Sequence, residues 1–169
     1  YIADTVTRLL DLHAAGKRIL CEGAQAFALD VDQGSYPYVT SSSTGTNGVA
    51  PGTGLPPSSI RKVLGVVKAY STRVGSGPYP TELHDEIGAG IAERGHEFGT
   101  VTGRPRRVGW FDAVPLRYAV AVNSVSSIML NKLDILSGIP SIQLCVAYEV
   151  DGKRVDAWPS SGSMLARAV

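Results

Sequence analysis

The stretch Ile128–Leu136 reads IMLNKLDIL and joins an apolar run to a short segment rich in polar residues. Branched apolar side chains followed by an abrupt polar segment are typical of a buried strand and the loop after it. The sequence therefore predicts a strand that ends near Asn131. In an α/β fold, ligands bind beyond the carboxyl ends of the strands, so this loop is a candidate site.

The polar segment, Asn131 to Asp134, has the pattern Asn-Lys-x-Asp, which can recognise guanine. The Lys132 methylenes would cover the face of the base, and the Asp134 carboxylate would accept two N–H groups that adenine does not offer in that arrangement. Asn131 would hold the loop. The alternative is a polar strand end without a ligand, because the chain has no G-x-x-x-x-G-K-[ST] phosphate cradle. On these residues alone, both interpretations stay open.

The composition predicts one globular domain. The chain has 169 residues, 44% of them hydrophobic and 18% charged, which is enough to bury a core and argues against disorder. A formal net charge of +1 favours neither nucleic acid nor a membrane surface as a partner. No apolar run approaches the ~20 residues that a membrane span needs. We expect Cys21 and Cys145 to be buried free thiols, and no His or Cys to bind a metal.

Helices and strands are predicted to alternate. The spacing of apolar residues predicts helices over residues 1–15, 58–70 and 81–95, and a further helix that begins at the N-cap Asp112. Apolar runs predict strands over residues 18–22, 70–74 and 142–155, the last with a hairpin turn at VDGK. Residues 126–134 are predicted to supply a further strand, with NKLD as the segment at its end. Residues 23–57 are predicted to form a long ordered loop. This pattern predicts an α/β fold with a mostly parallel central sheet flanked by helices.

Two further stretches are candidate binding loops. FGTVTGRPRR, residues 98–107, combines threonine hydroxyls and glycines with three guanidiniums. Guanidiniums bind carboxylate and phosphate in a forked geometry, and glycines let backbone amides approach an anion. The alternative is a solvated basic surface loop. EGAQ ends in Gln25, whose amide would recognise a purine edge or belong to a structural turn.

Several stretches together resemble the adenylosuccinate synthetases. In chain order they are EGAQ with LDVDQGSYPYVTSSST, AYSTRVGSGPYPTEL, EFGTVTGRPRRVGWFDAV, NKLD and LCVAYEVDG, across roughly residues 18–152. The resemblance implies a fold that recognises guanine as P-loop GTPases do. It also implies a GTP-dependent ligase of AMP biosynthesis, in which GTP phosphorylates the 6-oxygen of IMP and the L-aspartate amine then displaces the phosphate.

The resemblance also implies which residues bind each substrate. IMP would contact Gln25, Thr40, Val74 and Arg104. L-Aspartate would contact the loop Gly99, Thr100, Val101, Thr102 and Gly103, together with Arg104 and Arg106. GTP would contact Arg106, Lys132, Leu133 and Asp134. Two anionic substrates and a charged transfer need cations and donors that are already in place in a site closed to water.

The family's glycine-rich GDEGKGK loop, with its catalytic aspartate and the histidine that follows, has no counterpart here. We therefore expect residues 1–169 to be one partial domain, the central portion of a synthetase, without catalytic residues and not competent alone. Mg²⁺ would be bound mainly by residues outside the chain. By resemblance the protein would be a cytoplasmic homodimer that binds neither nucleic acid nor membrane. The alternative hypothesis is a non-catalytic nucleotide-, phosphate-binding or assembly module that retains the fold.

Overall fold

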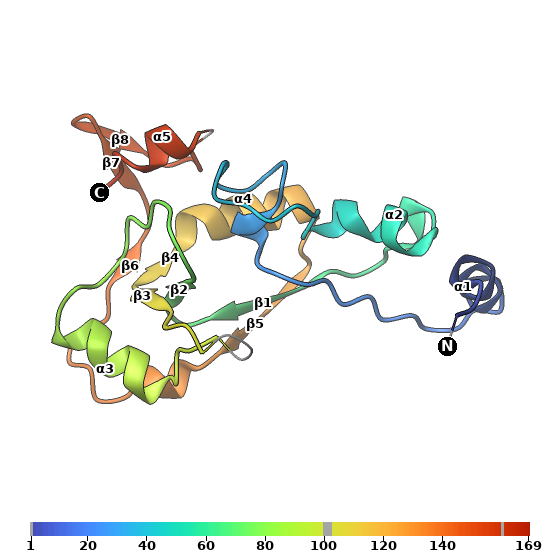
Figure 1. Ribbon diagram of the computed structural model, residues 1–169, viewed down its shortest axis with the longest axis horizontal. Coiled ribbons are helices and arrows are strands. Elements are labelled where there is room, and N and C mark those ends of the chain that lie inside the picture. The colour runs from blue at the N-terminus through green and yellow to red at the C-terminus, as the bar shows by residue number, and fades with distance from the viewer. Residues whose placement is uncertain (1, 100–102, 160) are drawn as a thin grey trace. The chain divides into compact units, whose positions relative to one another are not determined.

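The computed structural model describes residues 2–99, 103–159 and 161–169 (Figure 1). The chain divides into two compact units, residues 1–63 (unit 1) and residues 64–169 (unit 2). Helices alternate with strands, and parallel strand pairs occur, so the predicted α/β fold class is confirmed. Within the described ranges, no helix has the length and apolar character that crossing a membrane requires.

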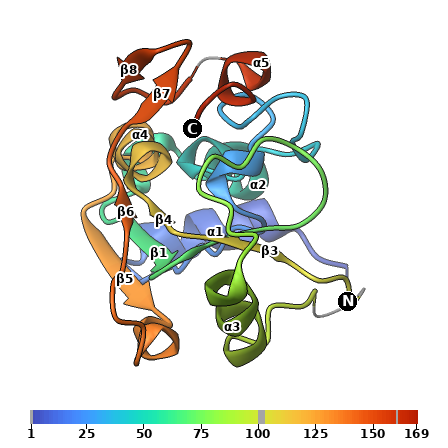
Figure 2. The ribbon, with the colours of Figure 1, turned by 90° about the vertical axis from the view of Figure 1, so that its left-hand side faces the viewer.

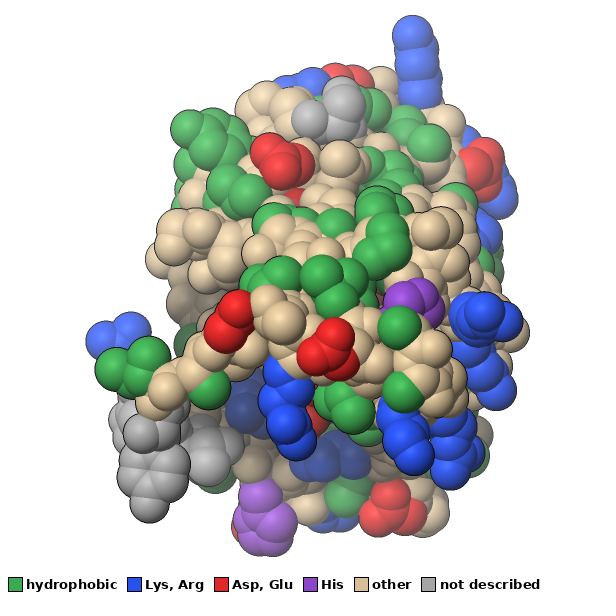
Figure 3. Space-filling model, turned by 90° about the vertical axis from the view of Figure 1, so that its right-hand side faces the viewer, with side chains coloured by type: hydrophobic (Ala, Val, Ile, Leu, Met, Phe, Trp, Pro, Cys, Tyr) green, Lys and Arg blue, Asp and Glu red, His purple; other side chains and the backbone are tan. Residues whose placement is uncertain are grey.

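Unit 1 begins with helix α1, Thr5–Ala14. The Asp4 carboxylate caps it by accepting from the Thr7 backbone N–H (3.0 Å) and hydroxyl (2.6 Å). Gly16, with φ +70°, ends it as predicted. Apolar side chains such as Ile2, Val6 and Leu10 remain exposed. Hydrophobic side chains are also visible among the charged ones on the face drawn in Figure 3.

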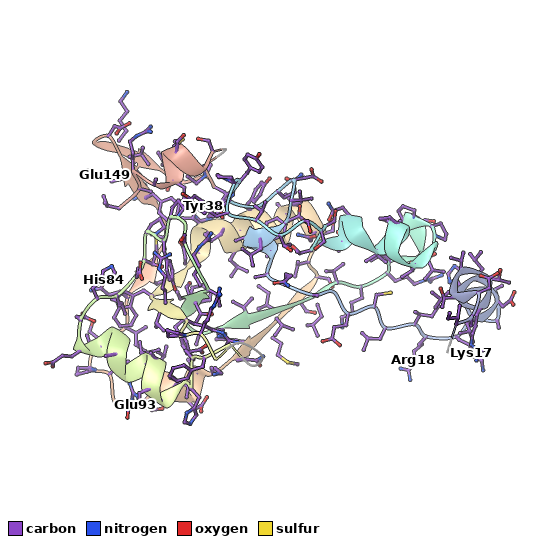
Figure 4. All side chains as sticks on the ribbon, viewed as in Figure 1. Lys17, Arg18, Tyr38, His84, Glu93 and Glu149 are labelled. Carbon is purple, nitrogen blue, oxygen red and sulfur yellow. The ribbon has the colours of Figure 1, made fainter. Side chains whose placement is uncertain are left out.

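The predicted buried strand at residues 18–22 is wrong. This segment has no regular structure; Leu20 is 93% exposed and Cys21 is exposed. Lys17 and Arg18 extend outward beside it (Figure 4). A strand forms only against a hydrogen-bonded neighbour, and none of the described strands pairs with this segment. Both cysteines are free, as expected, but Cys21 is exposed and Cys145 is only half-buried. The expectation of a buried thiol is therefore wrong for Cys21.

The long segment 23–57 is ordered around one buried carboxylate, Asp30, as the prediction of an ordered loop requires. Asp30 accepts from the backbone N–H groups of Asp32 and Gln33 (3.0 Å each), Thr44 (2.7 Å) and Gly45 (3.3 Å). Short helical turns complete the segment: η1 Phe27–Leu29, η2 Thr46–Gly48, α2 Val49–Thr53 and, just beyond it, η3 Pro57–Ser59. The Asp30 side chain therefore joins residues 30–33 to residues 44 and 45, and backbone hydrogen bonds from Val31 to Ser42 and from Thr40 to Leu29 join the same parts of the loop.

The predicted helix over residues 58–70 is wrong, because its second half contains strand β1, Leu64–Lys68, and the only helical residues of the stretch are Ser58 and Ser59 in η3. β1 pairs in parallel with β5, Ser127–Asn131, in the register Leu64 to Ser127 through Lys68 to Asn131 (Figure 1). Three valines and a central glycine in residues 63–67 favour a strand over a helix. The apolar side chains of β5 are about half exposed, because the described sheet here has two strands, so the prediction that β5 is buried is also wrong.

Helix α3, Glu86–Arg94, is shorter than the predicted helix at residues 81–95. Asp85 caps it, and His84 and Glu93 mark its two ends (Figure 4). Residues 81–83 are extended instead, because they hydrogen-bond along strand β3, Arg107–Gly109. β3 pairs antiparallel with β2, Ser71–Arg73, which lies in the predicted strand at 70–74.

A first core lies between α3, β3 and the β1–β5 region. Its buried members are Ala69, Tyr70, Ile91, Val108, Trp110 and Leu136. Tyr70 and Ile91 are the most deeply buried of these side chains. Burial of such large side chains contributes about 1.5–3 kcal/mol each, so this core fixes the segments on which the site below is built.

A second core joins helix α4 to the C-terminal hairpin. α4, Ala113–Asn123, is capped by the predicted Asp112, which accepts from the Val114 N–H (3.0 Å). Strand β4, Phe111–Asp112, pairs in parallel with β6, Leu144–Cys145. The predicted hairpin is present as β7, Tyr148–Val150, and β8, Lys153–Val155, with helix α5, Gly162–Leu165, beside it (Figure 2). The buried members of this second core are Val114, Tyr148, Val150, Leu165 and Ala168.

Candidate functional site

Lys132 lies between strand β5 and the short helix η4, Leu133–Leu136, in a left-handed backbone conformation with φ +58°. This conformation is uncommon outside glycine, and it turns the chain sharply at the end of the strand. The Lys132 ammonium donates to the Gly95 carbonyl (2.5 Å) and to a Glu97 carboxylate oxygen (3.2 Å). Lys132 is thus held in place, whereas the two residues proposed to act with it, Leu133 and Asp134, are exposed.

Glu97 is the centre of the ionic cluster to which Lys132 belongs, and its side chain is fully buried. Oε1 accepts from the Tyr70 hydroxyl (2.5 Å) and from the ammoniums of Lys68 (2.9 Å) and Lys132 (3.2 Å). Oε2 accepts from Lys68 (2.9 Å) and from the Arg106 guanidinium (2.9 Å). Three cations from three segments therefore share one carboxylate.

The cluster fixes the charge states of its members. Burial alone would favour a neutral Glu97, but hydrogen bonds from Tyr70, Lys68 and Arg106 outweigh it and lower the pKa of Glu97 to about 2. Burial and the contact with Glu97 raise the pKa of Tyr70, so the phenol keeps its proton and donates it. Near neutral pH, Glu97 is therefore an anion held between protonated donors.

The loop that carries the predicted aspartate contacts begins directly after Glu97. Phe98 and Pro105 form a bridge at its base, and Gly99 donates to the Arg104 carbonyl (2.8 Å). Gly103, with φ +63°, donates to the Gly99 carbonyl (2.8 Å) and closes the turn. The predicted contacts Thr100, Val101 and Thr102 lie outside the described residues. Gly99, Gly103 and Arg104 are thus brought together, with Arg104 exposed.

A model of the adenylosuccinate synthetase family matches residues 1–169. The chain belongs to the adenylosuccinate synthetase family. It is similar to the fully ligated adenylosuccinate synthetase from Plasmodium falciparum, with a TM-score of 0.95 and 42% identity over 99% of this chain and 40% of that one. It is also similar to the cyanophage S-2L succinoaminodeoxyadenylate synthetase bound to dGMP and dATP, with a TM-score of 0.63 and 29% identity over 86% of this chain and 47% of that one. The chain thus spans less than half the length of either relative.

The three arginines of the synthetase stretch at residues 98–107 have different surroundings. Arg106 contacts Glu97, whereas Arg107 lies on β3 and forms a two-pronged ion pair with Glu82. Arg107 also donates to the carbonyls of Gly75 (3.1 Å) and Gly77 (2.8 Å). Arg107 therefore lies outside the loop and ties the turn after β2 to β3, whereas the two interpretations of the loop itself stay open.

The predicted IMP contacts fall in both units. Gln25 is exposed in unit 1 and has φ +70°, while Thr40 is half-buried there and donates its backbone N–H to the Leu29 carbonyl (2.8 Å). Val74 and Arg104 belong to unit 2: Val74 follows β2 and is 47% exposed, and Arg104 follows the turn at Gly103. The four-residue IMP set stays a prediction.

The residues that the structure describes include no group of three or more His, Cys, Asp or Glu side chains arranged to hold a metal ion. The surroundings of Glu97 also do not fit a metal cation. All the side chains that contact its carboxylate are hydrogen-bond donors, and three of them are positively charged. We therefore derive no step of a synthetase reaction through Mg²⁺ at these residues.

Sequence reasoning missed Glu97, Lys68 and Tyr70 as members of this cluster. The apolar spacing around Lys68 predicts a helix, and the stretch EFGTVTGRPRRVGWFDAV contains Glu97 without indicating a role for it. The one available signal was an acid directly before a loop with three arginines, which suggests a charge partner. It does not say which cation is the partner, because Lys68 and Lys132 reach Glu97 from distant parts of the chain.

Proposed function

We propose that this chain forms the central part of an adenylosuccinate synthetase, a GTP-dependent carbon–nitrogen ligase that joins IMP and L-aspartate in AMP biosynthesis. The family membership and the 42% identity to the P. falciparum enzyme support the proposal. The activity belongs to a longer protein, and the chain alone is not competent. Its role is to supply substrate contacts.

The observation that carries the proposal is the geometry after β5. The Lys132 ammonium is held by Gly95 and Glu97, and Asp134 is exposed in the first turn of η4, which supports a role for the Lys132 methylenes in covering a base. A carboxylate accepts the paired N–H groups of guanine, and adenine lacks that pair. We infer that Lys132, Leu133 and Asp134 bind the guanine of GTP.

The other substrates would meet the cationic loop and the polar segments around it. The loop Gly99–Gly103 and the guanidiniums of Arg104 and Arg106 would bind L-aspartate, with Arg106 also near the GTP phosphates. A guanidinium has five N–H groups, so Arg106 has donors beyond the one given to Glu97. IMP would contact Gln25, Thr40, Val74 and Arg104. Loop closure over the amino acid would keep a phosphorylated IMP from hydrolysis.

Further properties follow from the family and are part of the same proposal. Mg²⁺ would assist phosphoryl transfer, held mainly by residues outside this chain, with the catalytic residues also outside it. The whole protein would be a cytoplasmic homodimer, without nucleic acid or membrane as a partner. Residues 1–169 would act as one partial domain of that protein.

Calorimetry on the full-length protein that carries this chain tests the guanine site. We expect GTP to bind more tightly than ATP, and Asp134→Asn to remove that preference, because an amide places a donor opposite a guanine N–H. The expected loss in GTP affinity is about tenfold or more. The matched control is Asp151→Asn, an equally exposed aspartate in the β7–β8 turn, which should leave the preference unchanged.

Equal affinity of the unsubstituted protein for GTP and ATP would contradict the proposal. It would favour the alternative, a non-catalytic module that binds phosphate without regard to the base. Formation of adenylosuccinate from IMP, L-aspartate and GTP, followed by its absorbance, tests the activity separately from the binding.

A further inference from the structure

Glu97 joins the two segments that carry the candidate aspartate and guanine contacts. Its Oε2 accepts from Arg106 at the base of the loop, and its Oε1 accepts from Lys132 after β5. The Arg106 backbone N–H also donates to the Glu97 carbonyl (2.9 Å). A cation from each candidate site therefore rests on the same fully buried carboxylate.

We propose that Glu97 is a positioning residue that couples L-aspartate binding at Arg106 to guanine recognition at Lys132 and Asp134. The inference rests on the proposed function and adds a residue that touches no substrate. Glu97 acts through Arg106 on one side and Lys132 on the other.

The physical basis is competition for one anion. Lys68, Arg106 and Lys132 all donate to Glu97, so positive charge is in excess and no cation has the carboxylate to itself. An anionic ligand that binds the Arg106 guanidinium weakens the hydrogen bond from Arg106 to Glu97 Oε2. Glu97 then holds Lys132 more strongly, and Lys132 is fixed for the base. Linkage makes the effect reciprocal, so bound GTP also favours aspartate.

Two neighbours keep the carboxylate in a single orientation. Tyr70 is almost fully buried and donates to Oε1, and Lys68 bridges both oxygens. Gly95 lies close by, and a Cβ there would collide with the Tyr70 hydroxyl. Because the carboxylate cannot rotate freely, a change at Oε2 is transmitted to Oε1 and is not lost in side-chain motion.

The test is steady-state kinetics of the full-length protein with Glu97→Gln. The amide keeps the size of the side chain but turns one oxygen into a donor that faces cations. We expect the KM values for GTP and L-aspartate to rise together, each about tenfold, and the KM for IMP to stay within about twofold. Binding of GDP, measured by calorimetry without IMP, should be enhanced by aspartate in the unsubstituted protein and not in the variant.

Glu82→Gln is the matched control, because Glu82 also forms a partly buried ion pair with an arginine of the same stretch, Arg107. It should lower stability without changing either KM. A Glu97→Gln protein whose aspartate and GTP KM values do not move together, or whose GDP binding still responds to aspartate, overturns the inference. If the unsubstituted protein forms no adenylosuccinate, the proposed function itself has failed.

A milder variant keeps the test decisive if Glu97→Gln does not fold. Tyr70→Phe removes only the neutral donor that orients the carboxylate. We expect both KM values to rise together by about threefold, which is less than the effect of losing the charge. Unchanged values, or a rise in one alone, would overturn the inference in the same way.

Discussion

Two buried carboxylates organise the two units in different ways. Asp30 in unit 1 and Glu97 in unit 2 have 0% and 1% of their surface exposed. Burial favours the neutral form of each, and hydrogen bonds outweigh it, so both have a pKa below the usual range. The donors differ: Asp30 is bound by four backbone N–H groups, and Glu97 by the side chains of Tyr70 and three cations.

The difference in donors separates a structural role from a functional one. Backbone amides move only if the chain moves, so Asp30 holds residues 30–33 against residues 44 and 45. Side-chain ammoniums and guanidiniums can exchange one anion for another, and those of Lys132 and Arg106 are partly exposed. A carboxylate bound by such groups stabilises the fold and also remains responsive to ligands.

The largest effect is expected from Asp30→Asn. The amide would place an NH₂ group opposite the N–H donors of Thr44 and Gly45, or of Asp32 and Gln33 in the other rotamer. The backbone N–H groups are fixed by the loop and cannot turn away from the new NH₂ group. Losing two charge-assisted hydrogen bonds should therefore lower the free energy of unfolding by about 4 kcal/mol. Chemical denaturation measures it.

The control for this prediction is Asp32→Asn, the same substitution two residues away at an exposed side chain. It should change stability by less than about 0.5 kcal/mol. A similar loss in both variants would break the comparison, because the loop would then depend on total charge and not on Asp30.

A somewhat smaller effect is expected from protonation of Glu97. Its pKa is lowered from 4.5 to about 2, so its contribution to stability is complete above about pH 4.5 and is lost as the pH falls toward 2. The shift corresponds to about 3 kcal/mol. Urea unfolding across this pH range should show the fall in the free energy of unfolding. The Glu97→Gln protein should lack the part of this pH dependence that comes from Glu97. An identical acid dependence in both proteins would contradict the cluster as described.

The smallest effect tests a third carboxylate, Asp112, which has fewer donors. Burial raises the pKa of Asp112, and the Tyr148 hydroxyl (2.5 Å) and Val114 N–H offset this only in part. A raised acid pKa contributes stability at low pH that is lost as the pH rises above 3.8 through the folded value. Tyr148→Phe should cost about 1 kcal/mol, and more at neutral than at acidic pH. A cost that does not grow with pH would show that Asp112 is insensitive to its donors.

Local signals in the sequence predicted the parts of the fold that depend on local chemistry. Asp112 is predicted as a cap because Asp is a preferred N-cap residue, and its carboxylate does accept the Val114 N–H. The VDGK turn is predicted because Asp-Gly favours a hairpin turn, and Asp151 and Gly152 both adopt positive φ. The end of β5 at Asn131 followed from an abrupt change to polar residues.

Elements that depend on distant partners were not predictable in the same way. Residues 64–68 have apolar side chains at spacings that suit a helix, but pairing with β5, some sixty positions along the chain, makes them a strand. Residues 18–22 have strand-forming composition without a described strand to pair with. Lys132 was identified from its motif, whereas Glu97 was missed, because the three cations that define its role come from separate segments.

The sharing of Glu97 among three cations also restricts how this part of the sequence can evolve. Replacing Glu97 first leaves Lys68, Arg106 and Lys132 to repel one another around a buried gap. Replacing one cation first leaves two, and the anion remains satisfied. Replacement of Lys68, which we place in no substrate contact, is therefore less costly than replacement of Glu97. Across natural variants, position 68 should vary more freely than position 97.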